Sequence, residues 1–195
     1  MIIAKKQDRD HIVSILHSAF EPIKDNNSIN FIVKQDHKRS DRVKYLMEFL
    51  VDDCFDFGEI LLSDQRNACI LLKYPHTAKL TMAVIVRHVV LAFKCVGLSN
   101  VYKVLKRQAV IRKHHDVKEA CITPVIMGAT SDVKGFGFGA RLLKQLKDER
   151  EEATVLPVIF ETTTDANLSM YKRFGFKLIK EVQTKDFPLY FLRLN

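Results

Sequence analysis

The sequence has few cysteines, and they form no metal-binding pattern. The four of them are spread over the chain without a C-x-x-C pair: Cys54, Cys69, Cys95 and Cys121. Structural zinc sites usually draw on such closely spaced pairs, so the spacing predicts no metal site. We expect buried, reduced thiols instead, as in a cytoplasmic protein.

Long apolar segments are also absent. The most apolar stretch, Leu80–Leu98, is interrupted by Arg87, His88 and Lys94. A membrane-spanning helix needs about 20 mostly uncharged residues, so no membrane span is predicted. The first residues turn polar too early for a signal peptide. No internal repeat, low-complexity tract or linker divides the chain, and we expect one cytoplasmic domain over residues 1–195.

What the chain does have is length, apolar content and positive charge. It contains 195 residues, of which 47% are hydrophobic, and this suits one domain with a full core. Its formal net charge is +8 and its sequence pI is about 9.3. Such a balance favours anionic partners, among them phosphates, nucleic acid or an acidic membrane surface. A solvated basic surface explains the same charge equally well.

The spacing of apolar residues changes along the chain from helical to strand-like. Helices are predicted at about 8–20 and from Ser40, as N-cap, to Gly58, with a polar loop at 21–30 between them. The remaining predicted elements are a β-hairpin at 59–63 and 68–74, helices at 79–96, 99–115, 138–150 and 166–174, and strands at 119–129, 155–162, 175–182 and 189–194. This order predicts a mixed α/β (α+β) fold, with a mixed sheet between helices on both faces.

A glycine-rich turn joins the strand at 119–129 to the helix at 138–150. Gly135, Gly137 and Gly139 stand at alternate positions just before the helical pattern. Glycines let backbone N–H groups approach an anion closely, and the first turn of a helix offers unpaired donors and a partial positive charge. The turn therefore has the composition of a phosphate-binding loop.

Neither of the common nucleotide-binding loops fits this turn. In G-x-G-x-x-G the third glycine falls one residue later, and a P-loop needs Lys-Ser or Lys-Thr after its glycines. The pattern basic-x-x-Gly-x-Gly does fit, with Lys134, Gly137 and Gly139 in the three defined places. It resembles the acetyl-CoA pyrophosphate loop of the GNAT superfamily of N-acetyltransferases.

A second motif strengthens the resemblance. Asn167 stands four residues before Tyr171, and Phe174-Gly-Phe176 follows. This is similar to the late motif of the same superfamily, and it comes about one helix and one strand after the glycine loop, as in the family. The resemblance extends from about Ala120 to Leu194 and is thin before that.

The resemblance implies a single GNAT-like domain whose central strand separates from its neighbour to admit acetyl-CoA. Backbone groups at Met127, Gly128 and Ala129 would pair with the pantetheine amides, and Asn167 would contact the cofactor arm. Lys134, a point charge without the fork of an arginine, would neutralise the pyrophosphate. The backbone amides that would hold it are those of Gly135, Phe136, Gly137, Phe138, Gly139 and Ala140. The helical pair at about 79–115 is additional to the minimal fold, and it could cover the acceptor site, form a lid or mediate a homodimer.

The same resemblance implies acid–base roles for two side chains. Tyr171 would return a proton to the departing thiolate of coenzyme A. An acceptor ammonium must lose its proton before it attacks the thioester, and Glu161 is the first candidate for this base, with Glu119 the second. Both could equally be solvated charges at strand ends. The implied reaction is direct acetyl transfer, through a ternary complex, to the primary amine of a small molecule or peptide.

Two other functions stay open. A catalytically degenerate GNAT-like chain could bind an acyl-CoA for regulation, because Lys134 departs from the usual Arg or Gln. A nucleic-acid-binding module would use the basic helix 99–113. That helix interleaves only Tyr102 and Gln108 with its charges as groups suited to base contacts, so this alternative ranks lowest.

Overall fold

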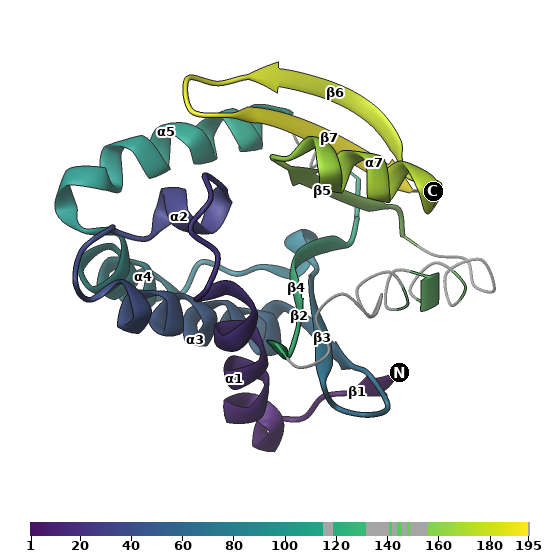
Figure 1. Cartoon of the computed structure of the whole chain (residues 1–195), viewed down its shortest axis with the longest axis horizontal. Helices are drawn as coiled ribbons and strands as arrows, with labels where there is room; N and C mark the ends of the chain where they lie inside the picture. The colour runs from purple at the N-terminus through teal and green to yellow at the C-terminus, as the bar shows by residue number, and fades with distance from the viewer. Residues whose placement is uncertain (115–118, 132–140, 142–143, 146–147, 149–155, 195) are drawn as a thin grey trace.

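The chain folds into two antiparallel sheets with helices on their outer faces (Figure 1). The computed structural model describes residues 1–114, 119–131, 141, 144–145, 148 and 156–194. Its helices are η1 (Lys6–Asp8), α1 (Arg9–Phe20), α2 (Ser28–Ile32), α3 (Arg39–Phe57), η2 (Pro75–Thr77), α4 (Met82–Leu91), the π-helix η3 (Ala92–Val96), α5 (Leu98–His114) and α7 (Asp165–Arg173). Its strands are β1 (Ile2–Ile3), β2 (Gly58–Leu62), β3 (Ala68–Lys73), β4 (Thr123–Ala129), β5 (Val158–Thr162), β6 (Lys177–Gln183) and β7 (Pro188–Leu194). The predicted mixed α/β architecture is confirmed.

The first sheet has the strand order β1-β2-β3-β4 and is buried on both faces. Along β3, Cys69 and Leu71 point to a core shared with α1 and α3, whereas Ile70 and Leu72 point to a core shared with the second sheet. Because successive side chains of a strand face opposite sides, burial of both faces explains the continuous apolar run in β3. The hairpin of β2 and β3 confirms the one predicted.

Helices α1 and α3 cover one face of the first sheet. Each presents apolar residues at helical spacing, and these are fully or almost fully buried: Ile12, Val13, Ile15 and Leu16 in α1, and Val43, Leu46, Met47 and Val51 in α3. Full burial of each such side chain contributes about 1.5–3 kcal/mol. Both helices were predicted from this pattern, and α3 ends at Gly58 as expected, although its N-cap is Lys38 rather than Ser40.

The second sheet has the order β5-β7-β6 and lies between two helices. In β7, Leu189 and Phe191 pack with Ile111 of α5, whereas Leu192 belongs to the core that includes residues of α7. One helix therefore covers each face of this sheet. The strand at 189–194 and the helix at 166–174 are confirmed within one residue, while β5 begins at Val158 rather than at 155.

Among the described residues, the backbones of the two sheets are joined by hydrogen bonds at one place, which we call the seam. The Ile122 N–H donates to the Pro157 carbonyl at 2.9 Å, and the Ile159 N–H donates to the Ile122 carbonyl at 2.8 Å. This makes a parallel bridge between Ile122 and Val158. In the residues that the structure describes, it is the only such pairing between β4 and β5, so the strands diverge beyond it.

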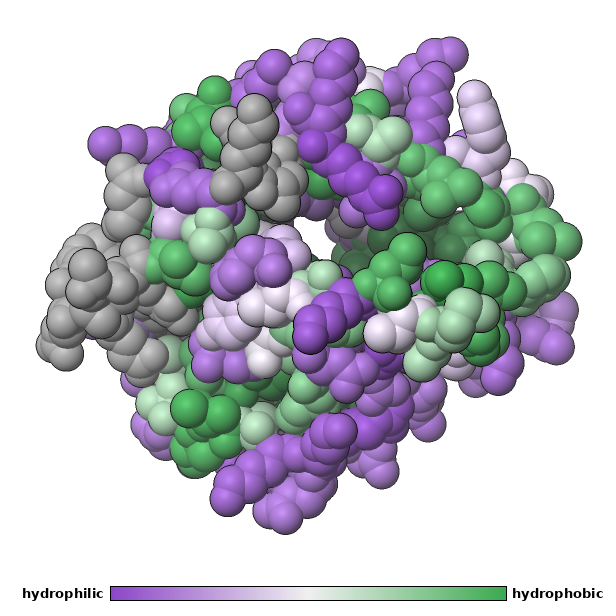
Figure 2. Space-filling view, turned by 180° about the vertical axis from the view of Figure 1, so that it is seen from behind, coloured by the Kyte–Doolittle hydropathy of each residue, from purple (hydrophilic) through white to green (hydrophobic). Residues whose placement is uncertain are grey.

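The helical pair predicted at 79–115 is present as α4, η3 and α5. The break falls at Gly97, whose φ of 75° is favourable only for glycine. Among the described residues, no single helix is long and apolar enough to cross a membrane, and only α4 with η3 and α5, bent by 120°, match a span together in length and composition. Exposed apolar side chains gather on this pair, including Met82, Val86 and Phe93, and a green area covers this side in Figure 2.

The loop predicted at residues 21–30 is only partly confirmed, whereas the predicted burial of the cysteines is confirmed. Residues 21–30 are not entirely a loop, because α2 begins at Ser28 with the Asn27 side chain accepting a hydrogen bond from the Asn30 N–H at 2.9 Å. All four cysteines lie in the described part of the chain, and each is buried and free, as expected.

Candidate functional site

A cavity of about 430 Å³ lies where β4 and β5 separate; we call it the seam cavity. One wall is the edge of β4 and the opposite wall is the end of β5 with α7. The segment before and within α2 closes a third side. Its lining residues are Phe20, Ile23, Asp25, Asn26, Asn27, Ser28, Ile29, Val125, Ile126, Met127, Glu161, Thr162, Thr163, Thr164, Asn167 and Tyr171.

The β4 wall offers backbone groups rather than side-chain chemistry. On its other edge β4 pairs with β3 over its whole length, with Met127 opposite Ile70 and Ala129 opposite Ala68. Within the described residues no strand pairs with the edge that faces β5 beyond the seam. Such an edge carries N–H and C=O groups that can bind an extended ligand.

The predicted cofactor residues of β4 differ in their surroundings. Met127 lines the seam cavity. Gly128 has α1 against it, because a Cβ placed there would lie 3.1 Å from Leu16 Cδ2 and 3.2 Å from Ala19 Cβ. Its lack of a side chain is therefore explained by helix packing. Ala129 packs against the core shared by the two sheets. The predicted pyrophosphate loop, residues 134–140, lies outside the described residues.

Helix α7 brings Asn167 and Tyr171 to the cavity together. The helix begins after Thr164, whose hydroxyl accepts from the Asn167 N–H at 3.3 Å. Because the two side chains are one helical turn apart, they share a face, and both line the seam cavity. The Tyr190 hydroxyl fastens the start of this helix to β7 by donating to Asp165 Oδ1 at 2.6 Å.

Tyr171 combines a packed ring with a hydroxyl at the cavity. Its ring stands edge-on to Phe160, with centroids 4.6 Å apart, and lies 5.7 Å from the ring of Phe176. Burial raises the pKa of Tyr171 to about 12, because the phenolate would lose its hydration. The phenol is therefore neutral at physiological pH. Because no described residue forms a hydrogen bond with its hydroxyl, the hydroxyl is available to a ligand.

The two carboxylates considered as the general base have different surroundings. Glu161 lies on β5 opposite Phe191 and lines the seam cavity. Glu119 instead accepts two hydrogen bonds from Arg193, at 2.8 and 3.3 Å, and this pairing holds the pKa of Glu119 below its usual value. Of the two candidates, only Glu161 is placed at the cavity.

The wall formed by residues 21–30 was not predicted as part of the site. Arg39, almost completely buried, donates to the carbonyls of Glu21 (2.8 Å) and Ile23 (2.6 Å) and to Asn30 Oδ1 (2.7 Å). These bonds hold the segment against α3. One pattern in the sequence could have predicted α2. Asn27, followed by Ser28 and then by apolar residues, is typical of the start of a helix rather than of a loop.

The whole arrangement matches solved structures of acetyltransferases. A Corynebacterium glutamicum protein described as "histone acetyltransferase HPA2 and related acetyltransferase" superposes with a TM-score of 0.65 at 16% identity, over 98% of this chain and 93% of that one. The Drosophila melanogaster polyamine N-acetyltransferase gives 0.64 at 14%, over 100% and 99%. The fold is that of the GNAT acetyltransferases.

A third GNAT structure extends the comparison. Arylalkylamine N-acetyltransferase 2 of Aedes aegypti gives a TM-score of 0.62 at 12% identity, over 99% of this chain and 96% of that one. No protein-family model matches the sequence, and no curated protein sequence matches it either. The GNAT fold is therefore visible in the arrangement of the backbone, although few residues are shared with these structures.

Proposed function

We propose that this protein is an N-acetyltransferase that transfers the acetyl group of acetyl-CoA directly to a primary amine. The observation that carries the proposal is the seam cavity, where one open strand edge, Glu161, Asn167 and Tyr171 meet. The neighbours with the same fold include enzymes whose descriptions name a polyamine or an arylalkylamine as acceptor. A small amine or a peptide amine fits the same chemistry.

The residues of the cavity fit acetyl-CoA. The open edge of β4 at Met127 presents backbone groups of the kind that pair with the amides of pantetheine, and Asn167 faces the same space. Lys134 and the backbone amides of residues 135–140 are proposed to hold the pyrophosphate, as their motif predicts. Acetyl-CoA supplies the activated acyl group.

The acid–base steps follow from the two side chains at the cavity. Glu161 takes a proton from the acceptor ammonium, directly or through a water, and the neutral amine attacks the thioester carbonyl. The C–N bond forms as the C–S bond breaks. Tyr171 donates its proton to the departing thiolate, and the second proton that the acylated nitrogen loses returns to Tyr171, directly or through a water. Because burial raises the pKa of Tyr171 to about 12, the phenol is protonated at neutral pH, as this step requires.

Calorimetric titration tests the cofactor first. We expect one acetyl-CoA to bind per chain, with dephospho-CoA and two salt concentrations run in parallel to measure the electrostatic share. The Gly137→Glu variant should lose binding, since a carboxylate would stand where the pyrophosphate is proposed to lie. Absence of binding to the unsubstituted protein would refute the proposal. Binding without turnover on any amine would instead favour a catalytically degenerate acyl-CoA-binding protein.

A further inference from the structure

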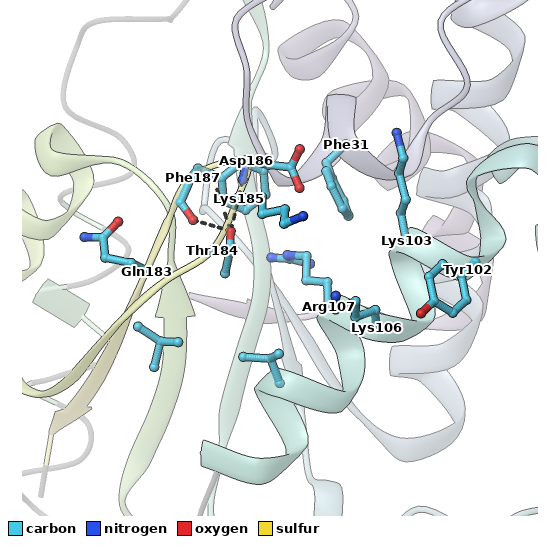
Figure 3. A pocket seen from close by; sticks show the side chains of 12 residues that line it. Phe31, Tyr102, Lys103, Lys106, Arg107, Gln183, Thr184, Lys185, Asp186 and Phe187 are labelled. Atoms are coloured by element: carbon cyan, nitrogen blue, oxygen red, sulfur yellow. Dashed lines mark hydrogen bonds between the residues drawn. The ribbon is translucent and has the colours of Figure 1, made fainter.

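A second cavity, of about 560 Å³, lies between α5, α2 and the turn that joins β6 to β7; we call it the hairpin cavity. Figure 3 shows Arg107 of α5 reaching across it toward that turn, with Phe31 of α2 above. Its lining residues are Phe31, Tyr102, Lys103, Lys106, Arg107, Val110, Val182, Gln183, Thr184, Lys185, Asp186 and Phe187. Four cationic side chains thus face one carboxylate.

Arg107 is the most enclosed of these cations. Its guanidinium lies 5.8 Å from the ring centre of Phe31 and 5.5 Å from that of Phe187. It donates one hydrogen bond, from Nη2 to Ser28 Oγ at 2.9 Å. Its Nε is buried and has no acceptor among the described residues. Burial lowers the pKa of Arg107, and the nearby Glu161 carboxylate opposes this shift.

Two other arginines of this chain are each paired with a carboxylate. Arg9 grips Asp52 with two hydrogen bonds, at 2.6 and 2.8 Å, and Arg42 grips Asp36 in the same way, at 3.0 and 2.8 Å. A guanidinium has five N–H donors that suit a carboxylate or phosphate. In the described part of the chain Arg107 donates a hydrogen bond to Ser28 and to no carboxylate, so most of its donors remain available within the cavity.

The hairpin cavity adjoins the seam cavity. Ser28, which lines the seam cavity, accepts the hydrogen bond from Arg107. Asn26, which also lines the seam cavity, donates to the Asp186 carbonyl at 3.2 Å. Figure 2 shows an opening that passes through the middle of the molecule. Arg107 and Glu161 thus place a cation and an anion in two adjoining cavities, close enough to interact electrostatically.

We propose that the hairpin cavity binds an anionic group of the acceptor, with Arg107 as the residue that selects it. The acceptor is then an amine that also carries a carboxylate or phosphate, joined by an apolar or aromatic body that contacts Phe31 and Phe187. Its ammonium end lies toward Glu161 and Tyr171. Only the placement of the acceptor's amine end rests on the proposed function. It distinguishes the chain from an enzyme for polyamines, because four cations would repel a polycation.

The anion site can be tested without acetyl-CoA. The probes are 3-phenylpropionate, phenyl phosphate and the uncharged 3-phenylpropanol, titrated into the protein by calorimetry. We expect one of the anions to bind at least about tenfold more tightly than the alcohol, and the preference to fall at high salt. The better of the two anions identifies the group. Equal binding of all three probes would overturn the proposal.

Variants then assign the site to Arg107. Arg107→Met should lose the anion preference, Arg107→Lys should keep part of it, and Arg112→Met, which removes an exposed charge from the same helix, should keep all of it. If Arg107→Met does not fold, Lys185→Met on the exposed turn should lower anion affinity in its place. An equal loss in Arg112→Met would show that only overall charge matters, and the assignment would be wrong.

Turnover separates this inference from the proposed function. 4-(2-Aminoethyl)benzoate is compared with phenethylamine, 4-aminobutyrate with butylamine, and spermidine serves as a polycation. We expect kcat/KM to be at least about tenfold higher for one carboxylated member over its partner, and this ratio to approach one in Arg107→Met. Anion binding without any acetyl transfer would refute the proposed function alone. Acetylation with no preference for a carboxylated amine would refute the inference alone.

Discussion

At the scale of single residues, Tyr171 is the side chain on which the proposed chemistry depends most. Its ring is fixed by Phe160 and Phe176, so its hydroxyl is held at one place beside the cavity. A catalytic acid needs this kind of fixed position as well as the right protonation state. Replacing the hydroxyl by hydrogen therefore leaves the packing intact and removes only the acid.

We expect Tyr171→Phe to lower kcat about a hundredfold or more while the affinity for acetyl-CoA stays the same. The measurement is steady-state kinetics together with calorimetric titration. The profile of kcat/KM against pH should show no loss from Tyr171 below about pH 11, because its pKa is about 12. Tyr45→Phe, remote from the cavity, serves as the control. Unchanged turnover in Tyr171→Phe would remove the acid role.

The four cysteines should be unreactive while the protein is folded. Burial raises the pKa of Cys54, Cys69 and Cys95 to about 12 from an ordinary value of 9.0, and that of Cys121 also rises. At pH 8 the reactive thiolate is therefore about a thousandfold rarer than in an exposed cysteine. We expect intact-mass measurement to find no iodoacetamide adduct on the native chain and four after unfolding. Because the unfolded thiols ionise first, the free energy of unfolding should fall as pH rises above about 9.

Residue chemistry was only partly visible in the sequence. Asn167 and Tyr171 were found through the motif that resembles the GNAT superfamily, and one helical turn suffices to put both on the same face. Arg107 was part of a basic helix and looked like any solvated charge. The hairpin cavity exists only because α2 and the β6–β7 turn, which are far from α5 in the sequence, pack on either side of Arg107. No local pattern records such an arrangement.

At the scale of elements, α3 determines the position of the segment that closes the seam cavity. Arg39 near its start binds Glu21, Ile23 and Asn30 with three hydrogen bonds, and Asn30 in turn donates to the carbonyls of Ile23 and Asp25. The segment thus obtains its shape from one buried guanidinium rather than from secondary structure.

We expect Arg39→Met to lower the free energy of unfolding by about 2–4 kcal/mol, since it removes three hydrogen bonds that a buried guanidinium donates to partly buried oxygens. It should also raise KM for the acceptor, because the cavity wall loosens. Urea unfolding and steady-state kinetics measure the two effects. Arg42→Met breaks a comparable contact, with Asp36 and the Lys94 carbonyl, away from the cavity. It should lower stability without changing KM, and an equal rise in KM would contradict the role given to Arg39.

Elements with a strong apolar period were predictable, and those fixed by side-chain bonds were not. The buried faces of α1 and α3 repeat at helical spacing, which gave both helices directly. The five residues of α2 are too few to form a stable helix alone, and the helix is held by its Asn27 cap and by contacts with α5. Polar composition alone therefore suggested a loop at 21–30.

At the scale of the whole molecule, bound acetyl-CoA should stabilise the contact between the two sheets. A ligand seated at the seam cavity contacts β4 on one side and α7 on the other. We expect acetyl-CoA at about a hundred times its dissociation constant to add about 2.7 kcal/mol to the free energy of unfolding. Thermal unfolding with and without the ligand measures this. A melting temperature that does not move under saturating acetyl-CoA would contradict binding to the folded chain.

The separation of the two sheets was predicted only through the family resemblance. The strands themselves could be read from apolar runs, but a run such as Val158–Phe160 does not show how far its pairing with β4 continues. That limit is set by the tertiary packing of side chains such as Ile122, which lie in the core between the sheets. The position of the seam is thus a property of the assembled molecule.

The seam also has a consequence for the order in which the chain opens. Each sheet is built from antiparallel pairs within its own part of the chain, one within residues 2–129 and the other within 158–194. Among the residues that the structure describes, only the bridge at Ile122 and Val158 joins their hydrogen-bond ladders. Amide protons at this bridge should therefore exchange with solvent sooner than those inside β3 or β7, as the two halves of the molecule part before either one unfolds.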